Sequence, residues 1–397
     1  MIDFQQVSQQ VHALGEKAPE RARQRYEARQ KACELLAYHA NELVPLRQKV
    51  ALALRYDDKL RCAVPLNESL MAHIPAPALP SRLVLLAADG SQINPNPHDA
   101  VQYGLINVGI IQMAYGFPNA PSPTIRSELF YDEALYDLTE SLVALRRDLA
   151  ERRVLADLAE AAVAGAAAFG TAQPSVLAMT DGPLELWGAK DDDSAAEFGE
   201  SLKDYLAALN RLQRLGAANA GYVDKPNANL VVRLLEVVQA SGENLENIRH
   251  FRPWRMITDR DLYADLLAPG ERSAVFEMQS KSAEKYTGGL ALRFFYLNVG
   301  RREMPWLARV EIPAWVAEAP ETLDALHAVL LDQCRTMGAG PYPYLLHRAH
   351  ETAVVTHEEK AQITQMIVHE LRRRGVTVGE MSHKQVAKDL PGRTRYG

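Results

Sequence analysis

A chain of 397 residues with 47% apolar and 24% charged residues has the composition of a globular protein of one large domain or two smaller ones. It has no apolar run of about 20 residues and no basic leader with an apolar core, so we expect neither a membrane span nor a signal peptide. The net charge of −6 argues weakly against nucleic-acid binding by the whole surface, and three distant cysteines argue against a zinc site and indicate a cytoplasmic protein.

Residues 1–62 are predicted to form an N-terminal helical extension. Pro19 is expected to separate a short first helix from a long second one, from Glu20 to about Tyr56, because proline interrupts a helix interior. The second helix carries one apolar face, made of Leu35, Leu36, Leu43, Leu46, Val50 and Leu54. This face needs a cover, and we expect it to contribute to a homodimer.

The segment Arg21–Lys31 is strongly basic, and shorter basic clusters lie at Arg146–Arg153, Arg372–Arg374 and Lys384–Arg395. A solvated helix face is the more common role of such a cluster, and contact with DNA is the alternative. In a dimer, paired clusters would line a channel that threads one DNA strand. Binding would then weaken as salt rises, with little sequence preference.

Prolines make residues 63–82 an extended connector, after which a domain of residues 83–397 is expected. Strands are predicted at 83–89, 103–115 and 124–131, then a helix at 132–169 and a strand at 174–181. The order strand, strand, strand, helix, strand predicts an α/β fold in which an antiparallel meander opens a mixed sheet flanked by helices.

Beyond residue 181 the pattern is less regular. Helical spacing predicts helices at 195–215, 229–240, 261–267, 321–337 and 357–374. Apolar runs predict strands at 221–223, 272–278, 290–299 and 307–312.

Two predicted strands deliver the same dipeptide, Asp89-Gly90 and Asp181-Gly182, where each is expected to leave the core. Gly90 is expected to let the backbone turn there. A carboxylate at the end of a buried strand needs a partner, and a metal ion is one such partner. The alternative is that Asp-Gly is common turn chemistry after a strand.

The helix between the two aspartates is expected to supply a third carboxylate. A six-residue strand to Asp181 climbs ~20 Å, and a helix descends that distance in about 14 residues. If the helix frays near Gly165, counting back reaches Glu151, whereas Glu160 lies too low. A glutamate on an exposed helix face is commonly just solvated, which is the other interpretation.

Three converging carboxylates bind hard divalent cations through oxygen. With a phosphodiester as substrate, two ions about 4 Å apart activate water and stabilise the leaving oxygen. This arrangement of strands and carboxylates is ribonuclease-H-like, which as fold analogy alone is only a starting hypothesis.

Six stretches in the same order resemble the NurA nuclease family, over about residues 83–390. Three of them carry the carboxylates: 85–91, the helix with Arg147 and Glu151, and 179–184. The other three are 221–226 with 231–235, 258–262 with 269–276, and 342–345 with 349–350. Gly182-Pro183 departs from the Gly-Ser common in the family, and residues 161–170 look like an insertion after the glutamate.

The resemblance implies a Mn²⁺-dependent 5′-to-3′ exonuclease with single-strand endonuclease activity, probably safest described as a two-metal site that also admits Mg²⁺. It implies a role in DNA-end resection and double-strand-break repair, as a homodimer with a HerA-type hexameric ATPase. By motif match, the metal residues are Asp89, Glu151, Asp181 and His350. Tyr342 completes the catalytic set.

Residue types alone say less about the C-terminal motif. An imidazole near a metal can ligate it, move a proton or contact phosphate, and His347 lies three residues from His350 on the same expected helical turn. Without the resemblance, a lone histidine is more commonly structural and Tyr342 would belong to the core.

A rival hypothesis is a catalytically silent DNA-binding clamp that couples an ATPase to DNA. The presence of all three carboxylates favours the enzyme. A ribonuclease or transposase-like nuclease of the same fold would differ in substrate and not in site. Cleavage polarity, strand preference and the need for a partner are open at this stage.

Overall fold

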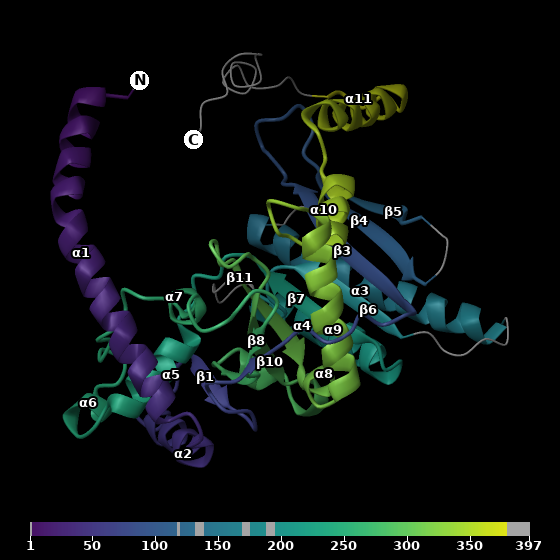
Figure 1. Ribbon diagram of the computed structural model, residues 1–397. Coiled ribbons are helices and arrows are strands. Elements are labelled where there is room, and N and C mark those ends of the chain that lie inside the picture. Colours follow the sequence, from purple (N-terminus) through teal and green to yellow (C-terminus); the bar gives the residue numbers. More distant parts are fainter. Residues whose placement is uncertain (1, 117–119, 132–138, 169–174, 188–194, 379–397) are drawn as a thin grey trace. The chain divides into compact units, whose positions relative to one another are not determined.

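The structure is a computed structural model that describes residues 2–116, 120–131, 139–168, 175–187 and 195–378 (Figure 1). The chain divides into two compact units. Unit 1 comprises Met1–Leu79, Gly182–Glu185 and Ala220–Pro343, and unit 2 comprises Pro80–Asp181, Leu186–Asn219 and Tyr344–Gly397. Each unit is therefore assembled from segments far apart in the sequence.

Unit 2 contains a mixed sheet. Its strands are β3 (Leu83–Ile93), β4 (Gly104–Tyr115), β5 (Ser122–Phe130) and β6 (Val176–Asp181). β3 pairs antiparallel with β4 and parallel with β6, and β4 pairs antiparallel with β5. This confirms the predicted meander followed by a parallel strand, and with it the ribonuclease-H-like α/β fold class.

Helices flank this sheet, as predicted. They are α3 (Glu140–Ala168), α4 (Ala195–Arg214), α10 (Tyr344–Ala353) and α11 (His357–Arg373). Helices α3 and α10 both pack on β3 and β4 (Figure 1). A Cβ on Gly109 of β4 would meet α10, and one on Gly90 of β3 would meet α3. Because Gly109 pairs with Asp89, the neighbour of Gly90, the two helices cover opposite faces here.

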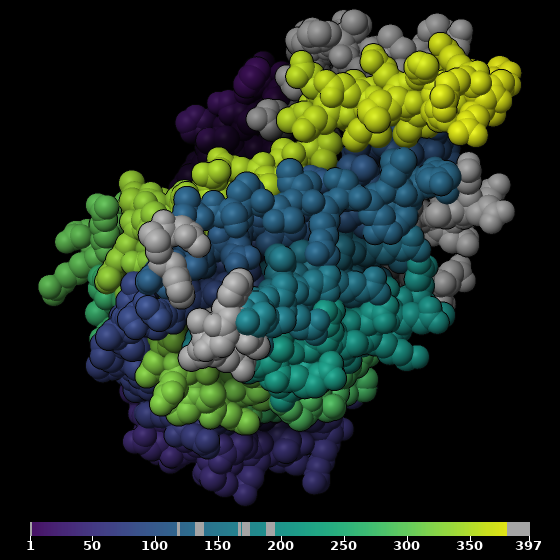
Figure 2. Space-filling model, turned by 90° about the vertical axis from the view of Figure 1, so that its right-hand side faces the viewer, coloured from purple at the N-terminus to yellow at the C-terminus, as the bar shows by residue number. Residues whose placement is uncertain are grey.

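Helix α11 begins with a capping box, in which Thr356 and Glu359 satisfy each other's backbone N–H groups. None of its residues is fully buried, but Ile363 and Ile367 pack against Ile93 and Tyr103 at the ends of β3 and β4. Figure 2 shows this yellow helix lying along the blue part of unit 2. The basic tail Lys384–Arg395 lies outside the described residues.

Unit 1 contains a second set of strands: β1 (Cys62–Pro65), β2 (His73–Ile74), β7 (Ala218–Val223), β8 (Arg272–Ser273), β9 (Phe276–Gln279), β10 (Leu292–Asn298) and β11 (Leu307–Pro313). The order β1-β9-β10-β11-β7 is antiparallel throughout, and β2 pairs with β8, which pairs with β10. The connector 63–82 is thus extended, but β1 and β2 tie it into a sheet.

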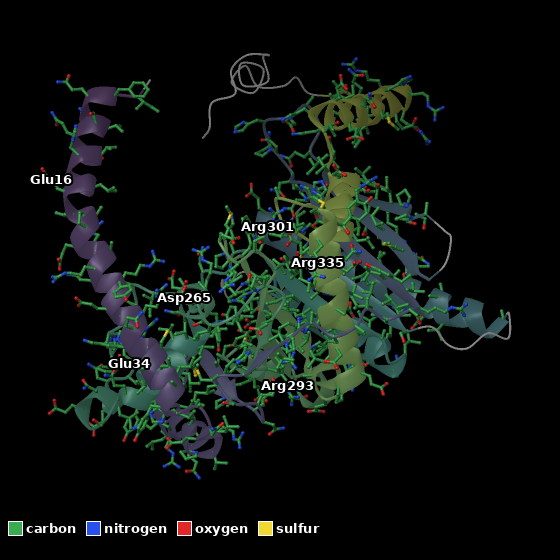
Figure 3. The ribbon with its side chains drawn as sticks, in the orientation of Figure 1. Glu16, Glu34, Asp265, Arg293, Arg301 and Arg335 are labelled. Carbon is green, nitrogen blue, oxygen red and sulfur yellow. The ribbon has the colours of Figure 1, made fainter. Side chains whose placement is uncertain are left out.

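The helical segments of unit 1 are α1 (Phe4–Tyr38), α2 (Leu43–Ala53), α5 (Leu230–Gln239), α6 (Glu243–Glu246), α7 (Asp259–Tyr263), η3 (Ala283–Lys285), η4 (Gly288–Leu290), α8 (Ala314–Ala317) and α9 (Pro320–Thr336). Ion pairs connect α1 to α7 and the residues after it: Arg25 to Asp261 at 2.6 Å, and Arg29 to Asp265 at 2.7 Å. Figure 3 labels Asp265 beside α1.

Helix α1 corrects the expectation for Pro19, because it runs through this residue without a break. Residues 2–27 are all exposed, so water can hydrate the carbonyl of Gly15 that the proline leaves without a donor. The break comes instead at residues 39–42. It places Pro45 in the first turn of α2, where a missing N–H is not needed.

The apolar face predicted for a dimer is also corrected. Leu36, Leu46 and Val50 are 0–2% exposed within a single chain, and both α1 and α2 pack on α5. The face therefore has its cover inside unit 1. The exposed apolar side chains of α1 lie nearer its start, at Phe4, Val7, Val11 and Leu14.

The other predicted elements are found with shifted ends. Helix α3 begins at Glu140, and residues 132–138 of the predicted helix lie outside the described part. The predicted strand 272–278 is two strands, β8 and β9. No helix among the described residues has the length and apolar character needed to cross a membrane.

Candidate metal centre

Strands β3 and β6 bring Asp89 and Asp181 to equivalent positions. The parallel register runs from Val84 opposite Val176 to Ala88 opposite Thr180. The next residue on each strand is the aspartate. The interior residues of both strands are buried, whereas the Asp89 side chain is 16% exposed and Asp181 lies at the exposed end of β6. The expectation that two strands deliver their aspartates side by side is met by this register.

Strand β3 does not end at Asp89, which corrects the predicted turn at Gly90. The strand continues to Ile93, and Gly90 pairs with Val108 on β4. Glycine is required here for a close approach. A Cβ at Gly90 would lie 2.5 Å from Cγ of Arg147 and 2.6 Å from Oε1 of Glu151. The glycine thus lets helix α3 bring Glu151 against the backbone next to Asp89.

Helix α10 brings His350 to Asp89 on the other face of β3. Its Nδ1 lies 2.6 Å from Oδ2 of Asp89, while the imidazole remains 63% exposed. The second oxygen of Asp89, Oδ1, accepts the N–H of Gly90 at 2.9 Å. His347 lies one turn earlier and faces Glu351 at 3.4 Å instead. Of the two histidines, only His350 is shown in contact with a predicted metal carboxylate.

Glu151 is buried on α3, with 9% of its side chain exposed. Burial raises the pKa of this carboxyl well above its usual range, the charges of Asp148 and Asp89 raise it further, and Arg152 and Arg147 oppose them. Nε of Arg147 lies 3.7 Å from Oε1 of Glu151. A buried carboxylate with so little compensation favours the approach of a cation.

Asp148 is a further acidic residue that the sequence reasoning missed. It lies one turn before Glu151 on α3, and Arg147 donates to its Oδ1 at 2.9 Å. Burial raises the pKa of Asp148, Arg147 lowers it, and Asp89 adds to the rise. The spacing of three residues to Glu151 was the signal available in the sequence, since it places both carboxylates on one helix face.

Arg147 provides positive charge to this acidic group. Burial alone would lower the pKa of its guanidinium, but the carboxylates of Asp148, Glu151 and Asp89 raise it. One cation is therefore electrostatically coupled to three carboxylates. This arrangement indicates how strongly the site attracts positive charge.

Glu160, the other glutamate considered on α3, is used differently. Arg211 of α4 donates to both of its oxygens, at 2.8 and 2.7 Å, and also pairs with Asp157 at 2.8 Å. Helix α3 persists to Ala168, beyond the expected fraying at Gly165, yet Glu151 still reaches Gly90. The structure therefore gives Glu160 an ion pair between two helices.

Tyr342 belongs to unit 1, whereas Asp89, Glu151, Asp181 and His350 belong to unit 2. Within unit 1, the half-buried ring of Tyr342 packs edge to face on Tyr222, with centroids 5.6 Å apart and planes at 89°. Its catalytic role stays a prediction.

The donor types at this site fit a hard divalent cation. They are carboxylate oxygens of Asp89, Glu151 and Asp148, with an imidazole at His350. Among the described residues, however, no group of three or more acidic, histidine or cysteine side chains is close enough to enclose a metal ion. Asp89 faces α10 and Glu151 faces α3, which explains why the carboxylates do not already converge.

Comparison with known proteins gives one match that covers most of the chain. The sequence model of the family described as the NurA domain matches residues 83–355. This range contains all five predicted site residues. No curated protein matches the chain.

Several solved structures are similar to this one. The NurA nuclease from Sulfolobus solfataricus is 12% identical, with a TM-score of 0.43, over 83% of this chain and 92% of that one. A second NurA structure is 11% identical, with a TM-score of 0.35, over 75% and 90%. The catalytic domain of human endonuclease V is 13% identical, with a TM-score of 0.31, over 84% and 98%.

Proposed function

The chain belongs to the NurA family, and from this premise we propose that it is a metal-dependent DNA nuclease. The observation that carries the proposal is the position of Asp89. It follows the last residue in register with β6, next to the site where Glu151 approaches β3, and it contacts His350. Acidic residues from a strand and a helix, with an imidazole beside them, are suited to hydrolysis of a phosphodiester.

Asp89, Glu151 and Asp181 would hold the cations, with His350 as a further ligand or a proton carrier. Bound divalent cations supply activation of water and stabilisation of the leaving oxygen. The chain's own groups prepare this site: His350 orients the carboxylate of Asp89, and the N–H of Gly90 fixes its other oxygen. The exposed imidazole can exchange a proton with solvent.

The finer features of the proposal come from the family resemblance. We propose 5′-to-3′ exonuclease and single-strand endonuclease activity with Mn²⁺, or with Mg²⁺ in its place. The partners would be DNA ends, a second copy of the chain and a HerA-type hexameric ATPase. The process would be DNA-end resection in double-strand-break repair, in the cytoplasm.

The test is cleavage of labelled single- and double-stranded DNA with Mn²⁺, Mg²⁺ or EDTA. Asp89→Asn and Glu151→Gln should each lower the rate by at least ~100-fold, since loss of residues that merely support metal ligands already reduces activity by about 10 to 100-fold. Glu160→Gln is the matched control on the same helix, because it loses only the ion pair with Arg211.

Two outcomes would overturn parts of this proposal. Loss of activity in Glu160→Gln but not in Glu151→Gln would mean that the wrong glutamate is assigned. DNA binding without cleavage under any metal condition would favour the silent clamp, especially if calorimetry finds no metal site that Asp89→Asn removes.

A further inference from the structure

Unit 1 contains a cavity of about 540 Å³ that no part of the proposed nuclease site uses. Its lining comes from the segment before β1 and from the region around α5. Five basic side chains line it: Lys59, Arg61, Arg233, Arg249 and Arg252. The volume lies within the range of pockets that bind small ligands.

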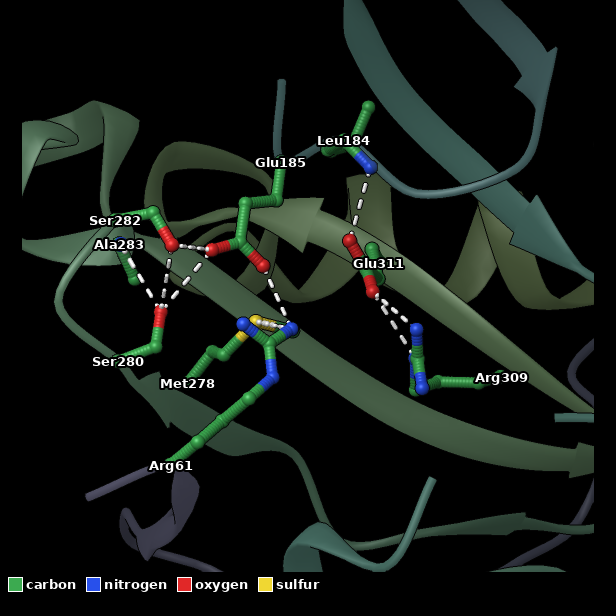
Figure 4. Close-up of polar contacts among 9 residues, drawn as sticks. All are labelled: Arg61, Leu184, Glu185, Met278, Ser280, Ser282, Ala283, Arg309 and Glu311. Atoms are coloured by element: carbon green, nitrogen blue, oxygen red, sulfur yellow. Dashed lines mark hydrogen bonds and ion pairs between the residues drawn. The ribbon is translucent and has the colours of Figure 1, made fainter. Parts of the chain in front are cut away.

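Arg61 is held in place by a buried carboxylate. Its Nη2 donates to Oε2 of Glu185 at 2.6 Å and contacts Sδ of Met278 at 3.4 Å (Figure 4). Ser280 and Ser282 donate to the other oxygen of Glu185, whose side chain is fully buried. The guanidinium therefore has a fixed position at the cavity wall before any ligand arrives.

A second buried carboxylate holds two more arginines. Oε2 of Glu236 accepts from Arg233 at 2.9 Å and from Arg252 at 2.8 Å. Arg233 is almost fully buried and also donates to the carbonyls of Ile248 and Phe251. One glutamate thus organises two guanidinium groups, and their combined charge exceeds its own.

Lys59 and Arg249 are different, because both are exposed and neither has an ion-pair partner within the described part of the chain. The acidic residues at the cavity are Asp57 in its lining and the two glutamates behind it, Glu185 and Glu236. Five positive charges therefore face three negative ones. This surplus persists although the whole chain carries a net charge of −6.

The start of α5 lines the cavity but adds little to anion binding. The N–H groups of Val231 and Val232 already donate to Asp259, at 3.0 and 2.8 Å. The side chains must therefore supply the recognition. Guanidinium groups pair in a fork with phosphate oxygens, which fits a wall of fixed arginines.

We propose that this cavity is a binding site for a phosphate ester of DNA, either a backbone phosphate of a bound strand or the mononucleotide that cleavage releases. The identity of the ligand as DNA rests on the proposed function. The residues that line the cavity include no aromatic side chain on which a base could stack. Recognition is therefore through phosphate and independent of base sequence.

The experiment uses the full-length protein in EDTA, so that DNA is not cleaved. Calorimetry measures binding of dTMP and of inorganic phosphate, and anisotropy measures binding of an oligothymidylate of about 20 nucleotides. Lys59→Gln combined with Arg249→Gln removes the two unpaired cations. Arg302→Gln, at another exposed position of unit 1 outside the lining, is the charge-matched control.

The double variant should bind at least about tenfold more weakly, and its salt dependence should fall by about one per lost phosphate contact. An effect on the oligonucleotide alone identifies a backbone phosphate, and an effect on dTMP identifies the mononucleotide. The proposal is overturned if none of the three probes binds, if the double variant binds like the wild type, or if Arg302→Gln weakens binding equally.

The test separates this inference from the proposed function. Pocket-dependent binding in EDTA without any cleavage in Mn²⁺ would remove the nuclease proposal alone. Cleavage that depends on Asp89, together with binding that ignores the pocket variants, would remove the pocket alone.

Discussion

Asp89 and Gly90 are adjacent on β3 but serve opposite faces of the sheet. The Asp89 carboxylate receives His350 from α10, and the missing side chain of Gly90 admits Arg147 and Glu151 from α3. Alternation along a strand makes this division unavoidable. A metal held by both Asp89 and Glu151 would therefore have to lie at the open side of β3 beyond the end of β6, where the two faces meet.

We expect Gly90→Ala to reduce cleavage more than it reduces stability. The new Cβ would meet side-chain atoms of Arg147 and Glu151 at 2.5–2.6 Å, and these can move away, but the movement displaces the proposed ligand. The rate should fall by about 10 to 100-fold, as for other changes that misplace a metal ligand. Cleavage assays and thermal melts measure the two effects.

Two further glycines serve as controls for Gly90→Ala. Gly109→Ala would press on backbone atoms of Ala353 and Ala349, so it should lower the free energy of unfolding by about 1–3 kcal/mol. Gly199→Ala in α4 meets nothing within 4 Å and should be neutral or stabilising. Unchanged cleavage in a folded Gly90→Ala would contradict the close-approach role.

The sequence identifies the site residues better than it identifies why they meet. The apolar run before Asp89 predicted a buried strand, and the run before Asp181 predicted its parallel neighbour. It did not reveal that β3 continues through Gly90, because an Asp-Gly pair has the same composition whether it turns or pairs with another strand. Asp148 was missed because its burial depends on how α3 packs.

At the scale of elements, α5 is capped by a residue from another helix. The buried carboxylate of Asp259, at the start of α7, accepts the N–H groups of Val231 and Val232 and the hydroxyl of Tyr296 at 2.6 Å. Burial raises the pKa of Asp259 to about 6 from its usual 3.8, against the effect of these hydrogen bonds. A residue 28 positions away in the sequence thus stabilises the helix start.

This elevated pKa predicts a pH dependence of stability. A carboxyl whose folded pKa is raised contributes stability that is present below its unfolded pKa and is lost as pH rises through about 6. The difference in free energy of unfolding between the wild type and Asp259→Asn, which cannot ionise, should fall by about 2 kcal/mol between about pH 4.5 and 8. Urea denaturation at both pH values measures it, and a constant difference would contradict the assignment.

Helix α1 contains the apolar residues that now fit the predicted homodimer best. Phe4, Val7, Val11 and Leu14 are 42–76% exposed and follow the spacing three, four, three of a coiled-coil seam. Sequence periodicity located an apolar face correctly in the later part of the extension. Whether such a face packs on its own unit depends on α5, which is distant in the sequence.

We expect Val7→Glu combined with Leu14→Glu to shift the protein from dimer to monomer in light scattering. These substitutions leave the buried residues of α1 and α2 unchanged, whereas deletion of residues 1–60 would remove part of the core of unit 1. Met366→Glu on α11 is the control, as it alters another exposed apolar residue. A double variant that stays dimeric would place the interface elsewhere.

At the scale of the whole molecule, the basic clusters are less available to DNA than their sequence suggests. Arg146 and Arg153 pair with Glu197 and Asp204 of α4, at 2.8 and 2.5 Å. In the first cluster, Arg25 and Arg29 pair with residues at α7 and just after it. A sequence displays runs of like charge, but the opposite charges that neutralise them come from other elements.

The exonuclease proposal predicts that substrate ends matter. With Mn²⁺, linear double-stranded DNA should be degraded and covalently closed circular duplex should remain intact, because only an end can be threaded to Asp89 and Asp181. Gel assays of equal masses of both substrates make the comparison. Equal rates would exclude threading while leaving the metal centre in place.

The contact between His350 and Asp89 joins residues 261 positions apart, and this separation has a consequence for biosynthesis. Translation delivers β3 first and α10 only after another 250 residues or so, and until then the strand face that α10 covers has no cover from that helix. A product that ends before Tyr344 would carry Asp89, Glu151 and Asp181 but not the imidazole. Interrupted translation would therefore not release an intact DNA-cutting centre, so that the potential to damage the genome arises only with the last part of the chain.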